Sequence, residues 1–338
     1  MIELLRALCA PAGVSGDERA AAEAAAEILR PLGEVSFTPL GGVACRVNSA
    51  AADAPLVLLT AHLDEIGLMV IRVTRDGFLK AAPCGGADRR SLAGARVTVH
   101  TESGPVPGVV GSVPPHLADE TNKGYPKAED LWIDLGLSGE EAARLVSPGD
   151  RISFGGAFRR LLGDRVSMKA LDNRAGCAAV IRAAQLLSGF CGARIAAALV
   201  TQEETGSAGA AADTFSLRPD RAYVVDVSMA QTPDDKPELC GKMGGGPMVG
   251  VSPWLSRALS RSLIETAERD GIPCQTEIMS GRTGTDADHI APAAGGVPTA
   301  LISIPLRYMH TPVEIVSAAD VENTARLIAA HVRRDFSC

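Results

Sequence analysis

The chain has 338 residues, of which 46% are hydrophobic and 22% charged, and this balance excludes a wholly disordered protein. Aromatic residues make up only 4%, so the core is expected to consist of small and branched aliphatic side chains. The formal net charge is -7, with 33 Lys and Arg against 40 Asp and Glu. Because there is no basic excess to bind phosphates, we expect no nucleic-acid partner.

The first residues, MIELLRALCAPAGVSG, carry Glu3 and Arg6 inside their apolar stretch, which is not the pattern of a signal peptide. No run approaches the ~20 apolar residues that span a bilayer. We therefore expect a cytoplasmic protein that makes no membrane contact. The eight cysteines are scattered, without a CxxC pair, which favours reduced core residues over a disulfide framework.

In chain order, the Ala- and Glu-rich segment Gly16–Leu32 predicts the first helix. Short continuous apolar runs predict strands that are buried on both faces. These runs are Pro55–His62, Ala193–Gln202, Arg221–Val227 and Val297–Pro305. Helical patterns follow Asp172 and Ser252, and another closes the chain. The alternation predicts an α/β fold, with a mixed sheet covered by helices on both faces.

The stretch from Val70 to Gly163 differs, because Gly and Pro repeatedly interrupt its short Val-rich runs. This pattern predicts a small all-β module. Its one helical segment, Ser138–Val146, begins with a capping pattern of Ser138 and Glu141. Buried-strand runs occur on both sides of the module, so we predict an insertion. The predicted limits are 1–69 and 164–338 for the α/β domain and 70–163 for the β domain.

Two histidines lie just past apolar runs. His62 ends the run LVLLTAH, and His310 follows the run TALISIP. Asp64, two residues after His62, faces the same way if the strand continues, and would then orient the imidazole. Acids occupy equivalent positions after other runs or at a helix start: Asp172, Glu203, Glu204 and Asp226. Ligand sites in open α/β sheets lie beyond the carboxyl ends of the strands, so these side chains are predicted to meet.

The charges of these residues fit a pair of divalent cations. Asp172, Glu204 and Asp226 supply -3 and a bridging hydroxide -1, which balances +4, and two neutral histidines complete the ligand set. Mixed imidazole and carboxylate ligands suit Zn, Co or Mn better than Ca or Cu(I). Such a pair of ions binds a carbonyl, lowers the pKa of the bridging water and stabilises a tetrahedral intermediate.

Each residue also has an ordinary interpretation when it is taken alone. A lone histidine is more often a hydrogen-bonded core residue, and an acid before a helix is more often an N-cap. Glu203 and Glu204 would fit a solvated loop, and Asp226 an ordinary strand end. Their joint placement at strand ends and helix starts is what favours a site. The other histidines lack that setting and are interpreted as structural, except His289, which stays open: His100, His116 and His331.

Six segments closely resemble the signature motifs of the tetrahedral (TET) aminopeptidases. This family comprises the glutamyl aminopeptidase-like co-catalytic metallopeptidases, some of which carry a cellulase or endoglucanase label. The segments are AHLDEIGLMV, KALDNRAG, TQEETGSAGA, VVDVSMA, GRTGTDADHI and SIPLRYMHTPVE. The resemblance extends from PAGVSGDE at Pro11 to the final helix. It departs from the family pattern at Asp288 and His289, which puts the shape of the substrate pocket in question.

Carried over position by position, the resemblance implies two metal ions. His62 and Asp226 would hold one ion, Glu204 and His310 the other, and Asp172 would bridge them.

The same resemblance implies that Glu203 is the general base and Asp64 the second-layer partner of His62. It further implies a cis peptide bond between Asp172 and Asn173. The β insertion would be a dimerisation domain, and the dimers would build a hollow dodecamer. Zn is the expected metal, with Co or Mn as alternatives.

The sequence thus predicts a metal-dependent aminopeptidase that acts on peptides. Two other enzyme classes stay open: an amidase or deacylase with the same metal site, and a glycosidase. A glycosidase needs two acids ~5–9.5 Å apart across a sugar. That reaction would leave His62, His310 and Asp226 without a role, and the low aromatic content argues against a sugar-binding groove. The preferred amino-terminal residue is not predicted.

Overall fold

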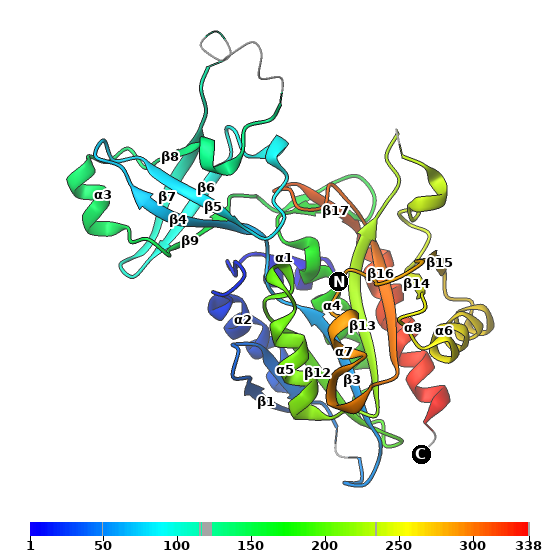
Figure 1. The fold of residues 1–338 in the computed structure, drawn as a ribbon. Helices are drawn as coiled ribbons and strands as arrows, with labels where there is room; N and C mark the ends of the chain where they lie inside the picture. Colours follow the sequence, from blue (N-terminus) through cyan, green and yellow to red (C-terminus); the bar gives the residue numbers. More distant parts are fainter. Residues whose placement is uncertain (49, 115, 117–123, 234, 337–338) are drawn as a thin grey trace.

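The computed structural model describes residues 1–48, 50–114, 116, 124–233 and 235–336. Figure 1 shows two parts, a large sheet with helices on both faces and a smaller β domain at one side of it. Within the described residues, no helix combines the length and apolar character needed to cross a bilayer. The mixed α/β fold with an inserted all-β domain agrees with the prediction.

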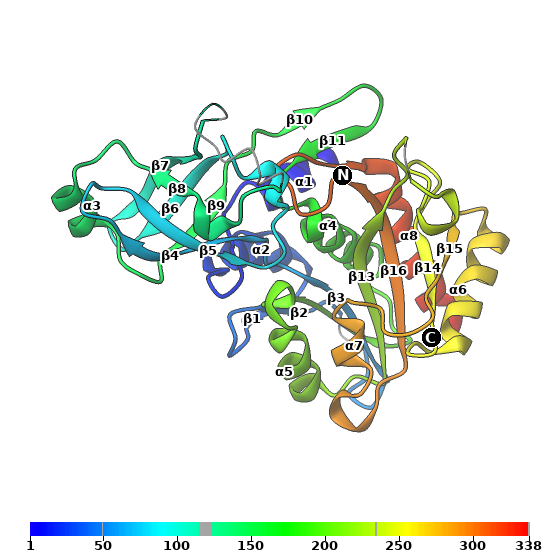
Figure 2. The same cartoon turned by 45° about the horizontal axis from the view of Figure 1, so that its top comes forward.

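The large sheet is mixed, and its central strands β12, β3, β13 and β16 are parallel to one another. Antiparallel strands extend it at both edges, and Figure 2 shows β10 and β11 as a hairpin beside β17. In spatial order the strands are β1 (Glu34–Phe37), β2 (Val43–Arg46), β12 (Arg194–Val200), β3 (Leu56–His62), β13 (Arg221–Met229), β16 (Thr299–Arg307), β17 (Glu314–Ser317), β11 (Arg165–Met168) and β10 (Arg159–Arg160), with β14 (Met248–Val251) and β15 (Gln275–Ile278) attached to β16.

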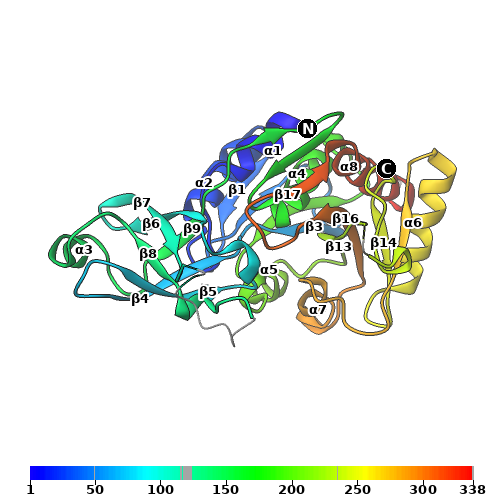
Figure 3. The same ribbon diagram turned by 90° about the horizontal axis from the view of Figure 1, so that it is seen from above.

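Helices cover both faces of this sheet, as Figure 3 shows from above. One face packs against α1 (Ile2–Cys9), α2 (Arg19–Leu29), α4 (Leu171–Leu186), α6 (Arg257–Asp270) and α8 (Ala318–Asp335). The other face packs against α5 (Ala208–Leu217) and α7 (Ala287–Ile290). The strands are therefore buried on both sides, which explains their continuous apolar runs.

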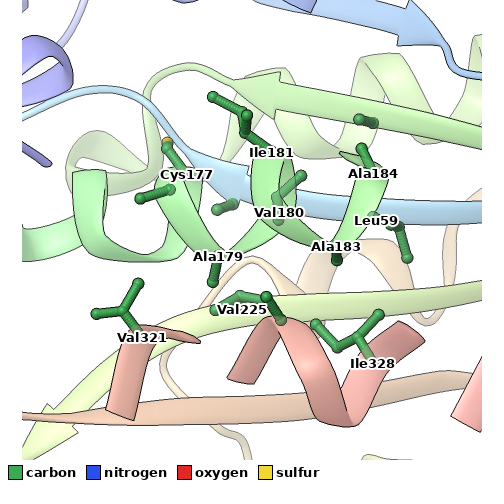
Figure 4. Close-up of a cluster of buried hydrophobic side chains, with 14 of the residues drawn as sticks. Leu59, Cys177, Ala179, Val180, Ile181, Ala183, Ala184, Val225, Val321 and Ile328 are labelled. Carbon is green, nitrogen blue, oxygen red and sulfur yellow. The ribbon is translucent and has the colours of Figure 1, made fainter. Parts of the chain in front are cut away.

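Close packing of small residues builds the core between α4, α8 and the sheet. Figure 4 shows Ala179 and Ala183 of α4 facing Val225 of β13 and the α8 side chains Val321 and Ile328. All five are fully or almost fully buried. Alanine lets the helix approach the sheet closely, and this explains how a chain with few aromatics fills its core.

The smaller domain is a closed β-barrel with its own apolar core. Leu79, Val99, Ile133 and Ile152 are among the side chains in that core. The helix α3 (Gly139–Leu145) begins with the expected capping box between Ser138 and Glu141. In order around the barrel the strands are β4 (Gly67–Val73), β5 (Leu79–Cys84), β8 (Trp132–Asp134), β7 (Gly104–Gly111), β6 (Arg96–Thr101) and β9 (Arg151–Phe154).

Strand alternation decides which side chains reach the functional edge of the large sheet. In β3, Leu59 packs with α4 and its neighbours, whereas Leu58 packs on the α5 side. His62 lies four residues after Leu58 and so belongs to the α5 face. Asp226 follows Val224, which is also on that face. Both polar side chains therefore emerge on the same side of the sheet.

Three sequence expectations differ from the structure. Asp226 does not end its strand, because β13 continues to Met229 alongside β16. The run Ala193–Gln202 forms a strand only over Arg194–Val200, and a 3-10 helix follows at Glu203–Thr205. Six cysteines are free thiols as expected, but Cys191 is disulfide-bonded, so the expectation of reduced cysteines is wrong there.

His331 has the structural role that its sequence setting suggested. It is fully buried in α8, and its Nδ1 lies 2.7 Å from the Tyr223 hydroxyl. Its Nε2 has no hydrogen-bond partner among the described residues. Burial lowers the pKa of His331 to about 4, so the imidazole is neutral at pH 7.

We predict that Tyr223→Phe lowers the free energy of unfolding by about 1–3 kcal/mol, because it leaves a buried ring nitrogen without its partner. Urea unfolding at pH 7 measures the change. Tyr125→Phe is the matched control, because Tyr125 is 62% exposed and should unfold like the wild type. Equal stability of the two variants would contradict the assigned hydrogen bond.

Candidate metal centre

The predicted site residues meet at the carboxyl ends of the parallel strands. His62 is the last residue of β3, and the pairing of β3 with β13 ends at Thr60 and Val224. Asp226 therefore lies beside His62, with 3.7 Å between Asp226 Oδ1 and His62 Nε2. Both are nearly fully buried.

Asp172 occupies the centre of the cluster. Its Oδ1 lies 3.2 Å from His62 Nε2, and its Oδ2 lies 3.4 Å from His310 Nε2. Each carboxylate oxygen thus faces a different imidazole. The residue stands at the irregular start of α4, where the peptide bond between Asp172 and Asn173 is cis, as the family resemblance implied.

The remaining acids complete two groups of potential ligands. Glu204 Oε1 lies 3.5 Å from His310 Nε2. The groups are His62 with Asp172 and Asp226, and Asp172 with Glu204 and His310, each with ligand atoms within 4.8 Å. Tetrahedral Zn²⁺ with bonds of about 2.0–2.1 Å places its ligand atoms about 3.3 Å apart, and these separations fit that geometry.

Glu203 forms a third grouping with His62 and Glu204. Its Oε2 lies 3.9 Å from His62 Nε2, farther than the other carboxylates that face this nitrogen. The Glu203 side chain is also more exposed than that of Glu204, at 16% against 5%. Glu203 is therefore the acid of the pair that water and substrate reach more readily.

Hydrogen bonds on the far side of each ring orient the two histidines. His310 Nδ1 lies 3.0 Å from the carbonyl oxygen of Gly86, which only accepts, so Nδ1 carries the proton. His62 Nδ1 lies 3.2 Å from the carbonyl oxygen of Asp64 and 3.4 Å from its carboxylate. In both rings Nε2 is therefore the nitrogen directed at the carboxylates. Once it has lost its proton it can bind a metal ion, which is how metal-binding histidines are held.

Asp64 also fixes the turn that carries the adjacent glutamates. Its two carboxylate oxygens accept hydrogen bonds from the backbone N–H groups of Glu203 and Glu204, at 3.0 and 3.1 Å. Asp64 is fully buried and is not among the described residues that line the pocket around His62. The strand β3 ends at His62. Asp64 therefore reaches His62 and the glutamates from the following loop, and not from a continued strand.

Glu314 is a site residue that the sequence interpretation missed. It lies on β17, is 1% exposed, and accepts hydrogen bonds from the backbone N–H groups of Asp172 and His310 at 3.0 and 2.9 Å. One buried carboxylate thus holds two potential ligands. Glu314 lies inside the motif SIPLRYMHTPVE, but its proximity to Asp172 depends on the pairing of β17 with β11, which the sequence does not reveal.

The pKa values describe a site crowded with negative charge. Burial, reinforced by Asp172, raises the pKa of Glu204 to about 8. Burial also raises the pKa of Asp226 well above its usual range, although His62 opposes the shift. The hydrogen bond to Asp172 raises the pKa of His310 to about 9. Ionised carboxylates at this density require compensating positive charge, and a divalent cation supplies it, so the donor set fits metal ions.

The other singled-out residues lie outside this cluster. His100 is in the barrel, with Nε2 2.8 Å from the Ser153 hydroxyl. His289, in the short helix α7, is not among the ligand groups of the described residues. Asp288 accepts hydrogen bonds from Thr283 and Gly284, which line the pocket, so this departure from the family pattern stabilises the pocket wall.

Comparison with known proteins identifies the family. Residues 33–327 match the M42 glutamyl aminopeptidase family. This protein belongs to the M42 family. Over 336 residues it is 36% identical to the lysyl aminopeptidase of Pyrococcus furiosus, covering 97% of this chain and 95% of the relative. The family is one of aminopeptidases, so the protein is a peptide hydrolase.

Solved structures of the family share the fold. A TET aminopeptidase from a marine sediment Thaumarchaeota archaeon superposes with a TM-score of 0.93 at 32% identity, covering 98% of this chain and 96% of the other. The TET1 peptidase of Pyrococcus horikoshii superposes with a TM-score of 0.86 at 31% identity, covering 100% and 99%. That peptidase assembles into a tetrahedron or a large octahedral shell.

We predict that Asp172→Ala removes both metal equivalents from this M42 peptidase, because each carboxylate oxygen faces a different ligand group. Asp226→Ala is the matched control, since Asp226 belongs to only one group and should cost mainly one equivalent. Elemental analysis after dialysis against buffered Zn²⁺ measures the stoichiometry. Retention of one full equivalent by Asp172→Ala would place the bridge on another residue.

Proposed function

We propose that this M42 peptidase is a two-metal aminopeptidase in which Glu203 is the general base. The observation that carries the proposal is the division of the Asp172 carboxylate between two imidazoles, each flanked by a further acid. His62 and Asp226 would hold one ion, Glu204 and His310 the other. Zn is the first candidate for this donor set, with Co and Mn as alternatives.

The pocket around these residues suits the amino end of a peptide. It has a volume of about 500 Å³ and contains four of the carboxylates, and no lysine or arginine is among the described residues that line it. Two bound ions would balance the charges of Asp172, Glu204 and Asp226. The Glu203 carboxylate would remain to attract an α-ammonium group, whereas an internal peptide segment carries no such charge. This charge distribution supports removal of residues from the free amino end.

Divalent ions bound here would polarise the scissile carbonyl and lower the pKa of an attacking water. The carboxylate of Glu203 would take the proton from that water and deliver it to the leaving amine. Burial raises the pKa of Glu203, with Asp172 and Asp64 adding to the rise and His62 opposing it. A pKa nearer the operating pH suits a group that takes up a proton and then returns it. Asp64 and Glu314 keep the backbone of the site in place.

We further propose that the barrel mediates dimerisation and that dimers build a hollow dodecamer. The support is the likeness to peptidases that form tetrahedral assemblies, since tetrahedral rotation relates twelve copies of one subunit. The domain limits of 1–69, 70–163 and 164–338 stay part of this proposal. The strand β10 (Arg159–Arg160) pairs with β11 and so belongs to the large sheet. The barrel strands span residues 67–154, and we expect the assembly contacts mainly from these residues.

We predict that Glu203→Gln lowers turnover of aminoacyl reporter substrates by about 10²–10⁴-fold, because the proton shuttle is lost while the ligands remain. Metal content should equal that of the wild type. Glu23→Gln, on the exposed surface of α2, is the control and should leave activity unchanged. Near-normal turnover by Glu203→Gln with full metal occupancy would exclude Glu203 as the base.

We predict that the intact protein sediments as a large particle and cleaves short peptides while sparing native proteins. Replacing residues 70–150 with a two-residue Asn-Gly linker should give dimers or monomers. The linker is short because Met69 and Arg151 are paired across β4 and β9. Sedimentation is the readout for this variant, since it also removes Gly86, which orients His310. A monomeric wild type would contradict the assembly proposal.

A further inference from the structure

The segment Val14–Glu18, within the motif PAGVSGDE, lies against the turn that carries Glu203. Val14 forms a parallel bridge with Glu65, and the Ser15 N–H donates to the Glu65 carbonyl oxygen at 3.2 Å. The segment is thereby tied to the loop that contains Asp64. Neither Ser15 nor Glu18 is among the residues that line the pocket around His62.

Two buried side chains of this segment contact the turn. Glu18 Oε1 accepts hydrogen bonds from the backbone N–H groups of Gln202 at 3.1 Å and Gly16 at 2.8 Å. The Ser15 hydroxyl lies 2.7 Å from the Thr205 hydroxyl. Glu18 is 4% exposed and Ser15 is 2% exposed, whereas Gln202 is half-buried and Thr205 is exposed. The segment thus supplies the buried side of each contact, and a buried polar group is costly to leave without its partner.

The turn needs external support because its backbone is strained at its first residue. Gln202 has a φ of 62°, a left-handed conformation that disfavours residues with a Cβ. Such residues persist where the surroundings determine their conformation. Asp64 holds the backbone of Glu203 and Glu204, and that leaves Gln202 and Thr205 at the two ends. Glu18 and Ser15 hold these ends.

The barrel supports the same segment from the other side. Arg151, the first residue of β9, donates from Nε to the carbonyl oxygen of Ser15 at 3.2 Å, and from Nη1 to the carbonyl oxygen of Gly149 at 2.8 Å. Ser15 therefore contacts Arg151 of the barrel on one side and Thr205 of the turn that carries Glu203 on the other. The position of the turn depends on contacts from both parts of the molecule.

We propose that Ser15 and Glu18 are positioning residues that fix the turn of residues 202–205, and with it the carboxylate of Glu203. The proposal rests on the proposed role of Glu203 as the base. Without these contacts the turn relaxes, and the Glu203 carboxylate moves from the place where it meets the attacking water. Misplacement of about 1 Å is enough to cost about 10²-fold in rate.

The test compares Glu18→Leu with Glu18→Gln, at saturating Zn²⁺ and with an aminoacyl reporter substrate. Leu removes the acceptor, so kcat should fall by about 10–100-fold, the usual effect of losing a supporting contact, with KM little changed. Gln keeps an Oε1 acceptor for both N–H groups and should restore most of kcat. A merely structural role would lower unfolding stability without this selective loss of kcat.

A double-mutant cycle tests the second contact without altering Glu18. Ser15→Ala and Thr205→Val each remove one hydroxyl, and the double variant should have nearly the same kcat as either single variant if the contact holds the turn. If the fold-losses in kcat of the two single variants instead multiply in the double variant, the role of Ser15 is overturned. Wild-type kcat in Glu18→Leu, or equal losses in Glu18→Leu and Glu18→Gln, would overturn that of Glu18. An inactive wild type would instead refute the proposed function.

Discussion

Carboxylate groups converge at the carboxyl ends of the central parallel strands, where little water reaches them. The arrangement of the site depends on this concentration of charge. Asp172 lies at its centre, and its two carboxylate oxygens face different imidazoles. Burial disfavours the ionised form and raises the pKa values of Glu204 and Asp226, and repulsion from neighbouring carboxylates adds to the rise. Divalent ions bound at these residues would neutralise the carboxylates and supply the chemistry proposed for the site.

A second layer of acids supports the first through the backbone. Asp64 accepts from the N–H groups of two successive glutamates, and Glu314 accepts from those of Asp172 and His310. Neither Asp64 nor Glu314 belongs to the groups of potential metal ligands among the described residues, because their oxygens are engaged by backbone N–H groups and, for Asp64, by His62 Nδ1. They fix the loops on which the ligands stand. Precision at the site thus comes from buried hydrogen bonds to loop backbone, since Asp172, Glu204 and His310 lie outside the strands.

The barrel insertion is connected to the site at two places despite its separate core. Gly86 orients the His310 ring, and Arg151 holds the carbonyl oxygen of Ser15 next to the catalytic turn. An insertion that only mediated assembly would need neither contact. The two domains therefore both contribute contacts to this site, and movement of the barrel would be transmitted to His310, the proposed ligand, and to the turn of Glu203.

The sequence by itself determined the fold class and the main strands, because strands buried on both faces appear as continuous apolar runs. It also determined the six residues that cluster with Asp172, because polar residues stand out at or near the ends of these runs. Local capping was equally readable, as at Ser138 and Glu141. Only the tertiary structure revealed the hydrogen bonds that Glu314 accepts from Asp172 and His310. The same is true of the contact of Gly86 with His310 and of the hydrogen bond between Glu18 and Gln202. These depend on pairings between distant segments, such as β17 with β11, and a backbone hydrogen bond to a remote carboxylate leaves no periodic signal in the sequence.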